Sequence, residues 1–379
     1  MKVLQVTNIY YPELRFGGPP LKIHLLSKGL REKGLAVNVV TFHSEKPTCS
    51  DREELEGIPV QYLPWIGRGF WQWPKRRDLL FEAVQKADIV HFYGLYNALC
   101  PLAAWYAKGL RKPYLLEPLG MHPPRARNQM IKKLYHRGFT SWMGRHASAI
   151  VASSAGEKLD LQSLAYTGTP LVVRRNGIDI ETFRRLPNVE TFRTRHGLPS
   201  DCRLILYLGR ISPIKNLEEL IRGFHEARCN GCVLLLAGPM LEPAYTAKLQ
   251  GLVAALNLQK SVKLIGPLYD KDKLAALAAA NLFVLPSLSE SFGNAAAEAV
   301  AAGVPVLLTE TCGIAPMIHG RAGLAVPLGS ASIARGLRIM MSPDRSQHVQ
   351  HQEQVMRELS WDEPVTQTAK LYEALLHAH

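Results

Sequence analysis

Two glutamates, Glu290 and Glu298, stand eight positions apart in a pattern that could do chemistry. An apolar run, Leu282–Leu285, precedes the first and indicates a buried parallel strand. The second lies in Ala295–Ala302, a run of helix formers that a glycine and a proline close. Glu290 is therefore expected in the loop at the carboxyl end of a strand, and Glu298 about one turn into the next helix. Open α/β sheets bind their ligands at that edge.

The backbone between the two acids is also suited to binding an anion. The N–H groups of Phe292, Gly293 and Asn294 are expected at a helix N-terminus, where the helix dipole favours phosphate oxygens. The alternative is a solvated loop acid followed by an exposed helix acid, and the pair alone does not decide between the two.

A second expected helix entrance carries two cations. The apolar run Leu204–Leu208 leads into G-R-I-S-P-I-K-N and then into the helical stretch Leu217–Arg228. Arg210 and Lys215 flank this entrance, where cations oppose the helix dipole unless an anion is present. A bidentate arginine and a lysine point charge together suit a diphosphate better than they suit capping.

A glycine pair, Gly17 and Gly18, precedes a third helical stretch, Leu21–Lys33, after the short strand Val3–Val6. Glycines in this position let the backbone approach a phosphate. The G-x-G-x-x-G fingerprint is absent, which disfavours a nicotinamide cofactor. A plain turn is the alternative for the glycine pair alone.

Strands and helical lengths alternate along the chain, which predicts βαβ units and parallel sheets. A length of 379 residues suggests two domains, and turn chemistry after Arg175 places the change of domain near residues 176–199. The expected strands are Val3–Val6, Ala36–Phe42, Ile89–Tyr93, Tyr114–Glu117 and Ala149–Ser153, then Leu204–Leu208, Val233–Ala237, Val262–Ile265, Leu282–Leu285 and Val304–Leu308.

The net charge of +13 is unevenly shared. Residues 1–185 hold 27 Lys and Arg against 15 Asp and Glu, whereas the remainder holds 18 against 17. A basic half attached to a neutral half implies an anionic partner for the first: nucleic acid, an acidic membrane surface or a phosphorylated substrate.

Two segments of the basic half could meet such a partner. Trp65–Arg77 sets four large aromatic residues among cations, which suits a bilayer interface, a single nucleic-acid strand, or an ordered loop packed on its own domain. Arg125–Arg145 is basic along a predicted helix and could extend the same surface.

No apolar run is long enough to span a bilayer, and the N-terminus lacks a signal-peptide pattern, so a cytoplasmic location is expected. Six cysteines in apolar surroundings fit a reducing compartment. The lone C-x-x-C of Cys229 and Cys232 is interpreted as structural thiols. In the D-x-D of Asp270 and Asp272, helix capping is favoured over metal binding, and no other metal-ligand spacing is present.

Together, G-G-P-P after the first strand, G-R-x5-N with Lys215, E-S-F-G-N-A-A-A-E-A and A-G-V-P-V resemble the retaining GT-B glycosyltransferases of the group-1 class (family 4). The resemblance runs in order over nearly the whole chain. It implies an α/β fold of two doubly wound Rossmann-like domains facing each other across a cleft: an acceptor-binding domain (1–185), a nucleotide-sugar-binding domain (186–359) and a C-terminal helix (360–379) that crosses back.

The resemblance also implies the activity. A retaining, metal-independent hexosyltransferase without a cofactor would move a sugar from a nucleoside-diphosphate sugar to a hydroxyl of a glycan or lipid-linked acceptor, in cell-surface polysaccharide or glycolipid synthesis. It would work in the cytoplasm or peripherally on the inner face of the membrane, and nucleic acid is not an expected partner. The alternatives are another GT-B sugar-nucleotide enzyme, such as an epimerase, and a non-catalytic glycan-binding protein.

Residue roles follow from the same resemblance. Glu290, Arg210 and Lys215 would be catalytic, with Glu290 on the transferred sugar and the two cations on the diphosphate. The remaining donor-binding positions would be Gly17, Gly18, Ser291, Phe292, Gly293, Asn294 and Glu298, the last on the ribose hydroxyls.

The chain departs from the family pattern on the sugar side. Many members carry a histidine in a P-H-G stretch, where this chain has Leu119. His122 lies close enough to compensate, and His91 occupies a stretch where H-x-H-G is common. These two histidines are therefore expected on the acceptor or sugar side.

Overall fold

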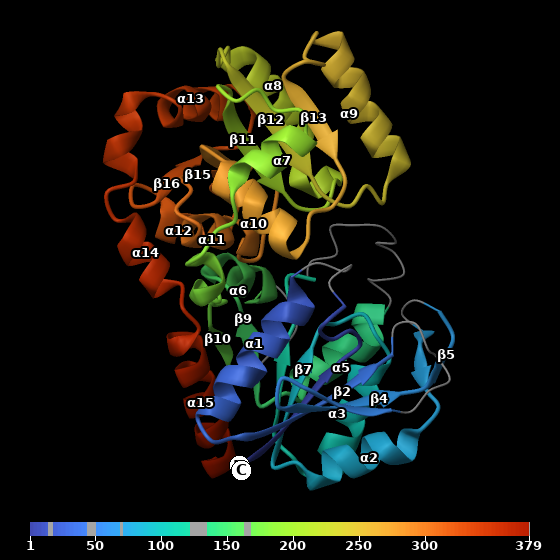
Figure 1. The fold of residues 1–379 in the computed structure, drawn as a ribbon. Coiled ribbons are helices and arrows are strands. Elements are labelled where there is room, and N and C mark those ends of the chain that lie inside the picture. The colour runs from blue at the N-terminus through green and yellow to red at the C-terminus, as the bar shows by residue number, and fades with distance from the viewer. Residues whose placement is uncertain (14–17, 44–50, 69–70, 122–134, 163–167, 379) are drawn as a thin grey trace. The chain divides into compact units, whose positions relative to one another are not determined.

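The computed structural model describes residues 1–13, 18–43, 51–68, 71–121, 135–162 and 168–378 (Figure 1). Contacts divide the chain into two units, Met1–Gly177 together with Trp361–His379, and Ile178–Ser360. The first boundary lies within the stretch 176–199 that the turn chemistry indicated, eight residues before the domain end expected at residue 185, and the final helix groups with the first unit. Within the described ranges, no helix is long and apolar enough to cross a membrane.

The first unit is built on an eight-stranded sheet in the order β10-β9-β8-β7-β1-β2-β4-β3. Its strands pair in parallel, except that the edge strand β3 runs antiparallel to β4. The bounds are β1 (Lys2–Thr7), β2 (Ala36–Phe42), β3 (Arg52–Leu55), β4 (Ile58–Leu63), β7 (Ile89–Tyr93), β8 (Tyr114–Glu117), β9 (Ala149–Ala152) and β10 (Leu171–Val173). Strands β5 (Trp65–Ile66) and β6 (Trp73–Pro74) form a separate hairpin.

Helices cover both faces of this sheet. Helices α1 (Pro19–Glu32) and α15 (Asp362–His377) share one apolar core with it, and α2 (Arg77–Lys86), α3 (Leu99–Gly109) and α5 (Ser141–Arg145) share the other. Segment η3 (His136–Thr140) leads directly into α5, and α6 (Ala155–Gln162) follows β9. The final helix is thereby an integral part of the first unit, because Val365, Ala369 and Tyr372 are buried beside α1.

The second unit holds a six-stranded, wholly parallel sheet in the order β13-β12-β11-β14-β15-β16. The strands are β11 (Arg203–Leu208), β12 (Cys232–Ala237), β13 (Val262–Ile265), β14 (Leu282–Leu285), β15 (Val306–Thr309) and β16 (Gly323–Val326). Nearly every residue of β11, β12 and β14 is buried, as a strand covered on both faces requires. The chain builds outward from β11 to β13 and then returns to the other side of β11 with β14. The sheet therefore has a topological switch point between β11 and β14.

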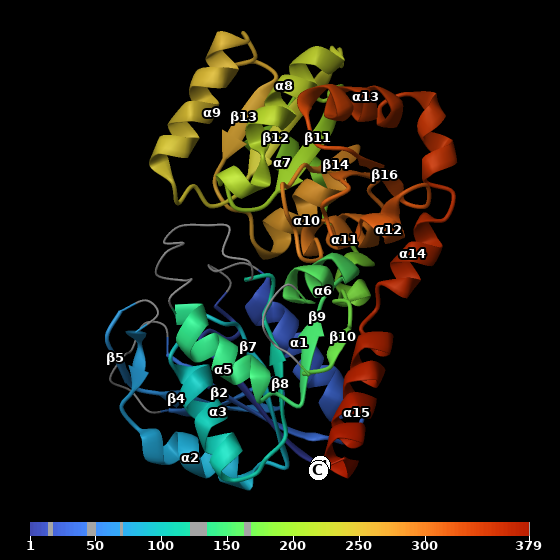
Figure 2. The same cartoon turned by 180° about the vertical axis from the view of Figure 1, so that it is seen from behind.

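Helical segments precede, connect and follow these strands, and α8 packs on α13 (Figure 2). They are η4 (Ile180–Phe183), α7 (Val189–Arg195), η5 (Pro213–Lys215), α8 (Leu217–Ala227), α9 (Pro243–Ala255), α10 (Asp270–Ala279), α11 (Asn294–Ala301), α12 (Ala315–Ile318), α13 (Ser330–Met340), η6 (Pro343–His348) and α14 (Gln352–Glu358). The ten strands expected from sequence all occur, and their ends differ from the observed ones by at most two residues.

Candidate active site

The loops that follow β11 and β14 meet at the switch point of the second unit. The N–H of Leu288 donates to the carbonyl of Ile214 at 2.9 Å, which ties the loop after β14 to η5. This contact brings the side chains of Lys215 and Glu290 together as an ion pair. Their side chains are only 16% and 19% exposed, so both charges are largely removed from water.

The backbone of Glu290 is held by the segment after β15. Its N–H donates to the carbonyl of Thr311 at 3.3 Å, and its own carbonyl accepts from the N–H of Gly313 at 2.9 Å. Behind it, the hydroxyls of Thr309 and Thr311 donate to the carbonyl of the buried Ser287 at 2.7 and 2.5 Å. The segments that follow three neighbouring strands of the sheet, β11, β14 and β15, therefore hold the Glu290 carboxylate in place.

Helix α11 begins directly after this loop. Its N-cap, Gly293, has φ +115°, and a Cβ there would lie 3.0 Å from Ile314, so the position favours glycine on two grounds. Among the described residues, the N–H groups of Phe292 and Gly293 find no acceptor. These donors and the positive end of the helix dipole lie next to Glu290.

Glu298 lies within α11 and has a partner that the sequence did not suggest. Lys273 of α10 reaches its carboxylate at 2.9 Å, and both side chains are mostly buried. Each glutamate of the pair therefore carries its own lysine, Lys215 from η5 and Lys273 from α10.

The loop after β11 contributes an exposed cation, Arg210, whose backbone carbonyl accepts from the Tyr207 hydroxyl at 2.9 Å. Burial, together with the nearby Glu290 carboxylate, raises the pKa of Tyr207 well above its ordinary value, so the phenol stays protonated as a donor. In the same loop, the buried hydroxyl of Ser212 has no partner among the described residues. It is an unused polar group beside Lys215.

The site residues expected in the first unit are Gly17, Gly18, His91 and His122. Gly17 and His122 lie outside the described residues. Gly18 is the exposed N-cap of α1, but Pro19 and Pro20 follow it, and proline has no N–H to offer to a phosphate. This helix entrance is therefore poorer in backbone donors than the expectation assumed.

His91 differs from its expected place on the sugar side. Its side chain is wholly buried, and its Nδ1 lies 2.8 Å from the hydroxyl of Tyr372 in α15 and 3.0 Å from that of Tyr93. Burial lowers the pKa of His91 to about 3 although Glu117 opposes the shift, so the ring is neutral. It holds the final helix on the sheet and has no exposed atom with which to contact a sugar.

Glu117, at the end of β8, is the centre of a buried charge cluster. Lys22 of α1 and Arg174, which follows β10, both pair with its carboxylate. Burial alone would raise the pKa of Glu117, but the two cations outweigh it and lower the pKa to about 2. The cluster joins α1, β8 and the end of β10 inside the first unit.

The D-x-D sequence has a different structural role from the one expected. Helix α10 begins at Asp270 with Tyr269 as its N-cap, and no side chain caps it. Asp272 instead pairs with Arg195 of α7 at 2.7 Å. In the ranges that the structure describes, no group of three or more His, Cys, Asp or Glu side chains could hold a metal ion.

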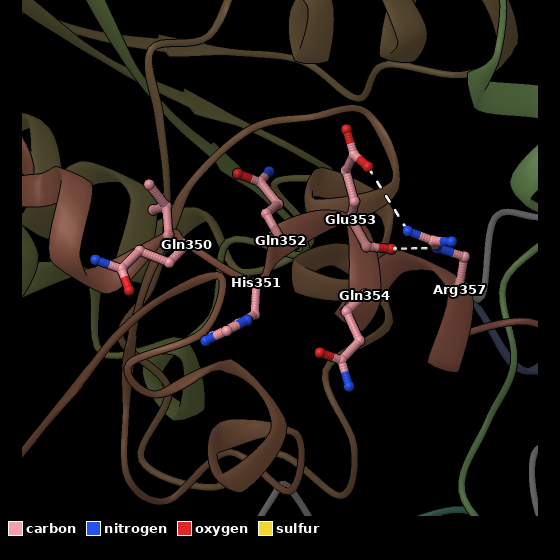
Figure 3. Close-up of a pocket in the computed structure, with 7 residues that line it drawn as sticks. Gln350, His351, Gln352, Glu353, Gln354 and Arg357 are labelled. Carbon is pink, nitrogen blue, oxygen red and sulfur yellow. Dashed lines mark hydrogen bonds and ion pairs between the residues drawn. The ribbon is translucent and has the colours of Figure 1, made fainter.

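Two surface pockets in the second unit contain none of the expected site residues. One is lined by Val349–Gln354 and Arg357, where the Arg357 guanidinium lies 3.7 Å from the Glu353 carboxylate (Figure 3). The other is lined by residues of η5, α8 and α9 with Leu288, on the loops that carry Lys215 and Glu290.

The geometry of the second unit is suited to a phosphorylated ligand. Two lysines, an exposed arginine, free backbone donors and a helix N-terminus gather at the carboxyl end of a parallel sheet. The two carboxylates beside them can accept hydrogen bonds from hydroxyl groups of the same ligand.

Comparison with known proteins decides the family. The model described as "Glycosyl transferases group 1" matches residues 188–354, and that described as "Glycosyl transferase 4-like domain" matches residues 17–177. A D-inositol 3-phosphate glycosyltransferase of Nocardioides sp. is 30% identical over 392 aligned positions, covering 94% of this chain and 85% of that protein. The chain belongs to the group 1 glycosyltransferases.

Other members of this glycosyltransferase family match over a smaller part. The D-inositol 3-phosphate glycosyltransferase of Streptomyces scabiei is 30% identical over 62% of this chain. The matched part spans 56% of the S. scabiei protein and 46% of its Streptomyces avermitilis counterpart, so the chain spans about half the length of these relatives.

Solved structures establish the fold of this group 1 glycosyltransferase as GT-B, with two Rossmann-like domains. A sucrose-phosphate synthase from Thermosynechococcus elongatus superposes with a TM-score of 0.77 at 23% identity, over 100% of both chains. The Anabaena protein HepE, solved with UDP and glucose, superposes with a TM-score of 0.76 at 19% identity, over 99% of this chain and 100% of its own.

Proposed function

We propose that the chain is a retaining glycosyltransferase that moves a sugar from a nucleoside-diphosphate sugar to a hydroxyl of a glycan or lipid-linked acceptor. The observation that carries the proposal is the Lys215–Glu290 ion pair at the switch point, beside the donor groups at the start of α11. The family to which the chain belongs and the UDP and glucose named for HepE support the choice of a nucleotide-sugar donor.

Each part of the donor would have a partner in the second unit. Arg210 and Lys215 would bind the diphosphate, and the N–H groups of Phe292 and Gly293 would bind its oxygens or those of the sugar. Glu290 would accept hydrogen bonds from the sugar hydroxyls, with Ser291 and Asn294 alongside. Glu298, oriented by Lys273 at 2.9 Å, would accept from the ribose hydroxyls.

The reaction would proceed on one face of the sugar. The bond between C1 and the diphosphate oxygen breaks, and its electron pair stays on the diphosphate. The acceptor hydroxyl then attacks C1 from the same face and gives its proton to the leaving phosphate oxygen. Arg210, Lys215 and the dipole of α11 would stabilise the charge that develops on the leaving group, and this stabilisation is the main catalytic contribution of the protein. No metal or cofactor has a role in this scheme.

An anionic acceptor would account for the uneven charge. Residues 1–185 carry 27 basic against 15 acidic side chains, and several relatives are named for a phosphorylated compound, D-inositol 3-phosphate. We propose that the enzyme works in the cytoplasm or peripherally on the inner face of the membrane, in polysaccharide or glycolipid synthesis.

A panel of nucleotide-sugars tests this function. A donor present at about 100 times its dissociation constant adds about 2.7 kcal/mol to the unfolding free energy and should raise the melting temperature by several degrees. The same donor should be hydrolysed slowly without acceptor, equally with and without a chelator. NMR of the transferred sugar reports whether the anomeric configuration is kept. If no nucleotide-sugar and no nucleoside diphosphate stabilises the protein, the proposed donor site is wrong.

A further inference from the structure

The outer surfaces of the helices on one face of the first sheet carry large exposed aromatic side chains. Trp105 of α3 is 62% exposed, and Phe81 of α2 is also exposed. Tyr106 connects them, with ring centroids 5.5 Å from Trp105 and 5.3 Å from Phe81. A soluble helix layer usually presents charged groups here, whereas α3 carries a single charged residue, Lys108.

The β5–β6 hairpin adds a second aromatic group. Trp71, 48% exposed, meets Phe139 of η3 edge-to-face at 6.4 Å, and Ile66 is exposed on the same hairpin. One end of the hairpin is fixed, because the Trp65 indole N–H donates to the carbonyl of His43 at 2.9 Å and its ring packs on the core. The expected aromatic segment is thus partly packed on its own domain, while Trp71 projects outward.

Both groups lie on the same side of the sheet. The inward-facing side chains of α2, α3 and α5 fill one apolar core, opposite the core that α1 and α15 share. Both views show α2, α3, α5 and the hairpin on the side away from α15 (Figures 1 and 2). Helix α5 connects the two groups, since it continues η3 and its Trp142 ring lies 5.5 Å from the ammonium of Lys108. We call this surface the aromatic–basic face: Ile66, Arg68, Trp71, Lys75, Arg77, Phe81, Trp105, Tyr106, Lys108, Phe139, Trp142 and Arg145.

The charge on the aromatic–basic face is positive. Asp78 and Glu82 of α2 are each engaged by a neighbouring cation, Arg76 and Lys86. The exposed side chains of Arg68, Lys75, Arg77 and Arg145 have no carboxylate partner in the described part of the chain. Exposed rings gathered on one face mark an interaction surface, and the cations beside them suit a partner that is anionic and partly apolar.

We propose that the aromatic–basic face binds the surface of an anionic lipid bilayer. Aromatic rings favour the headgroup region, where one side of the ring is apolar and the other wet, while lysine and arginine meet lipid phosphates. Stacking of nucleic-acid bases would need a groove along which the rings follow one another. Here the rings stand on the outer surfaces of three helices and a hairpin. This proposal rests on the proposed function in one respect: binding to the bilayer would bring a lipid-linked acceptor to the first unit.

Vesicle flotation tests the proposal with the whole chain. Phosphatidylglycerol vesicles should carry the protein at low salt, and phosphatidylcholine vesicles should carry far less. Salt at 0.5 M should release the protein, because the screening length falls from about 10 Å at 0.1 M towards about 3 Å at 1 M. The variant Lys75→Gln/Arg77→Gln should lower the partition coefficient about 30-fold, since each cation near an anionic surface contributes a factor of about five. Trp71→Ala/Trp105→Ala should lower the partition coefficient on both lipids. Brominated lipids should quench the tryptophan fluorescence of the parent more than that of Trp105→Phe.

A matched control comes from the second unit. Leu241, 63% exposed, and the exposed Lys260 are replaced in Leu241→Ala/Lys260→Gln, which should bind vesicles as the parent does. Nucleoside-diphosphate affinity is measured on every variant and should stay unchanged, which separates failure of this proposal from failure of the donor site. The membrane proposal is overturned by equal flotation on both lipids, by no flotation, or by a loss of vesicle binding in the control variant equal to that in Lys75→Gln/Arg77→Gln. A salt-sensitive dimer in place of vesicle binding also overturns it, because the partner would then be a second copy.

Discussion

Removing the ammonium of Lys215 should slow the reaction without preventing donor binding. In Lys215→Ala the leaving diphosphate loses a cation that is only 16% exposed, in a site where water cannot easily replace it. The loss of one such electrostatic partner typically costs about 3 kcal/mol of transition-state stabilisation, which corresponds to a turnover about 150-fold lower. Arg210→Ala should act in the same direction and less strongly, because Arg210 is exposed and water can compensate in part.

The substitution also leaves Glu290 without its cation, so stability must be separated from catalysis. The double variant Lys215→Met/Glu290→Gln removes both charges and should recover stability that the single variant loses, but not turnover. Lys271→Ala, at an exposed lysine of α10, is the matched control and should behave as the parent. Initial rates at saturating donor, scaled to the folded fraction from thermal unfolding, give the comparison. Near-parental turnover of Lys215→Ala under these conditions would refute the leaving-group role.

Three further outcomes are expected. Glu298→Gln should weaken nucleoside-diphosphate binding by about tenfold while Glu290→Gln mainly lowers turnover, and equal losses of affinity in a calorimetric titration would contradict this division of roles. Lys273→Ala should resemble Glu298→Gln in nucleotide affinity. An unchanged affinity would mean that the 2.9 Å ion pair with Lys273 does not orient Glu298 for the ribose. Acid should destabilise the first unit: the pKa of His91 is about 3 when folded and 6.5 when unfolded, so its contribution is present above pH 6.5 and declines as the pH falls. Denaturant titrations should show a loss of about 2 kcal/mol between pH 7 and pH 5 that is absent in His91→Gln.

The second sheet and its two site loops could be predicted because their signals are local. An apolar strand, a polar loop and a run of helix formers stand next to one another in Leu282–Ala301, and the structure keeps that order as β14, loop and α11. Proximity of Lys215 and Glu290 also follows from the sequence pattern, since the carboxyl ends of parallel strands lie at one edge. The sequence pattern did not predict that Lys215 and Glu290 form an ion pair with each other.

The parts that sequence reasoning missed depend on contacts between distant segments. Lys273 was not predicted as a site residue, because nothing in its sequence neighbourhood indicates that its side chain reaches Glu298 of α11. The cluster of Lys22, Glu117 and Arg174 joins three segments that have no common motif. His91 was misplaced for the same reason, since its partner Tyr372 is 281 positions away. Two short edge strands were missed: β3 is polar and mostly exposed, and the apolar run of β10 is only three residues long.

The two lysine–glutamate pairs suggest how the site changes when a donor binds. Both carboxylates are mostly buried, and an isolated buried carboxylate would be costly, so the lysines stabilise the ligand-free site. A diphosphate brings two or more negative charges and would compete with Glu290 for Lys215, leaving the carboxylate to accept hydrogen bonds from the sugar instead. A free nucleoside diphosphate lacks the sugar, so it would take the lysine without supplying those donors. A nucleotide-sugar should therefore bind more tightly than the corresponding diphosphate, and Glu290→Gln should reduce this difference. Titration of both ligands against the parent and Glu290→Gln measures it; an identical ratio of affinities in the two proteins would show that Glu290 does not exchange partners.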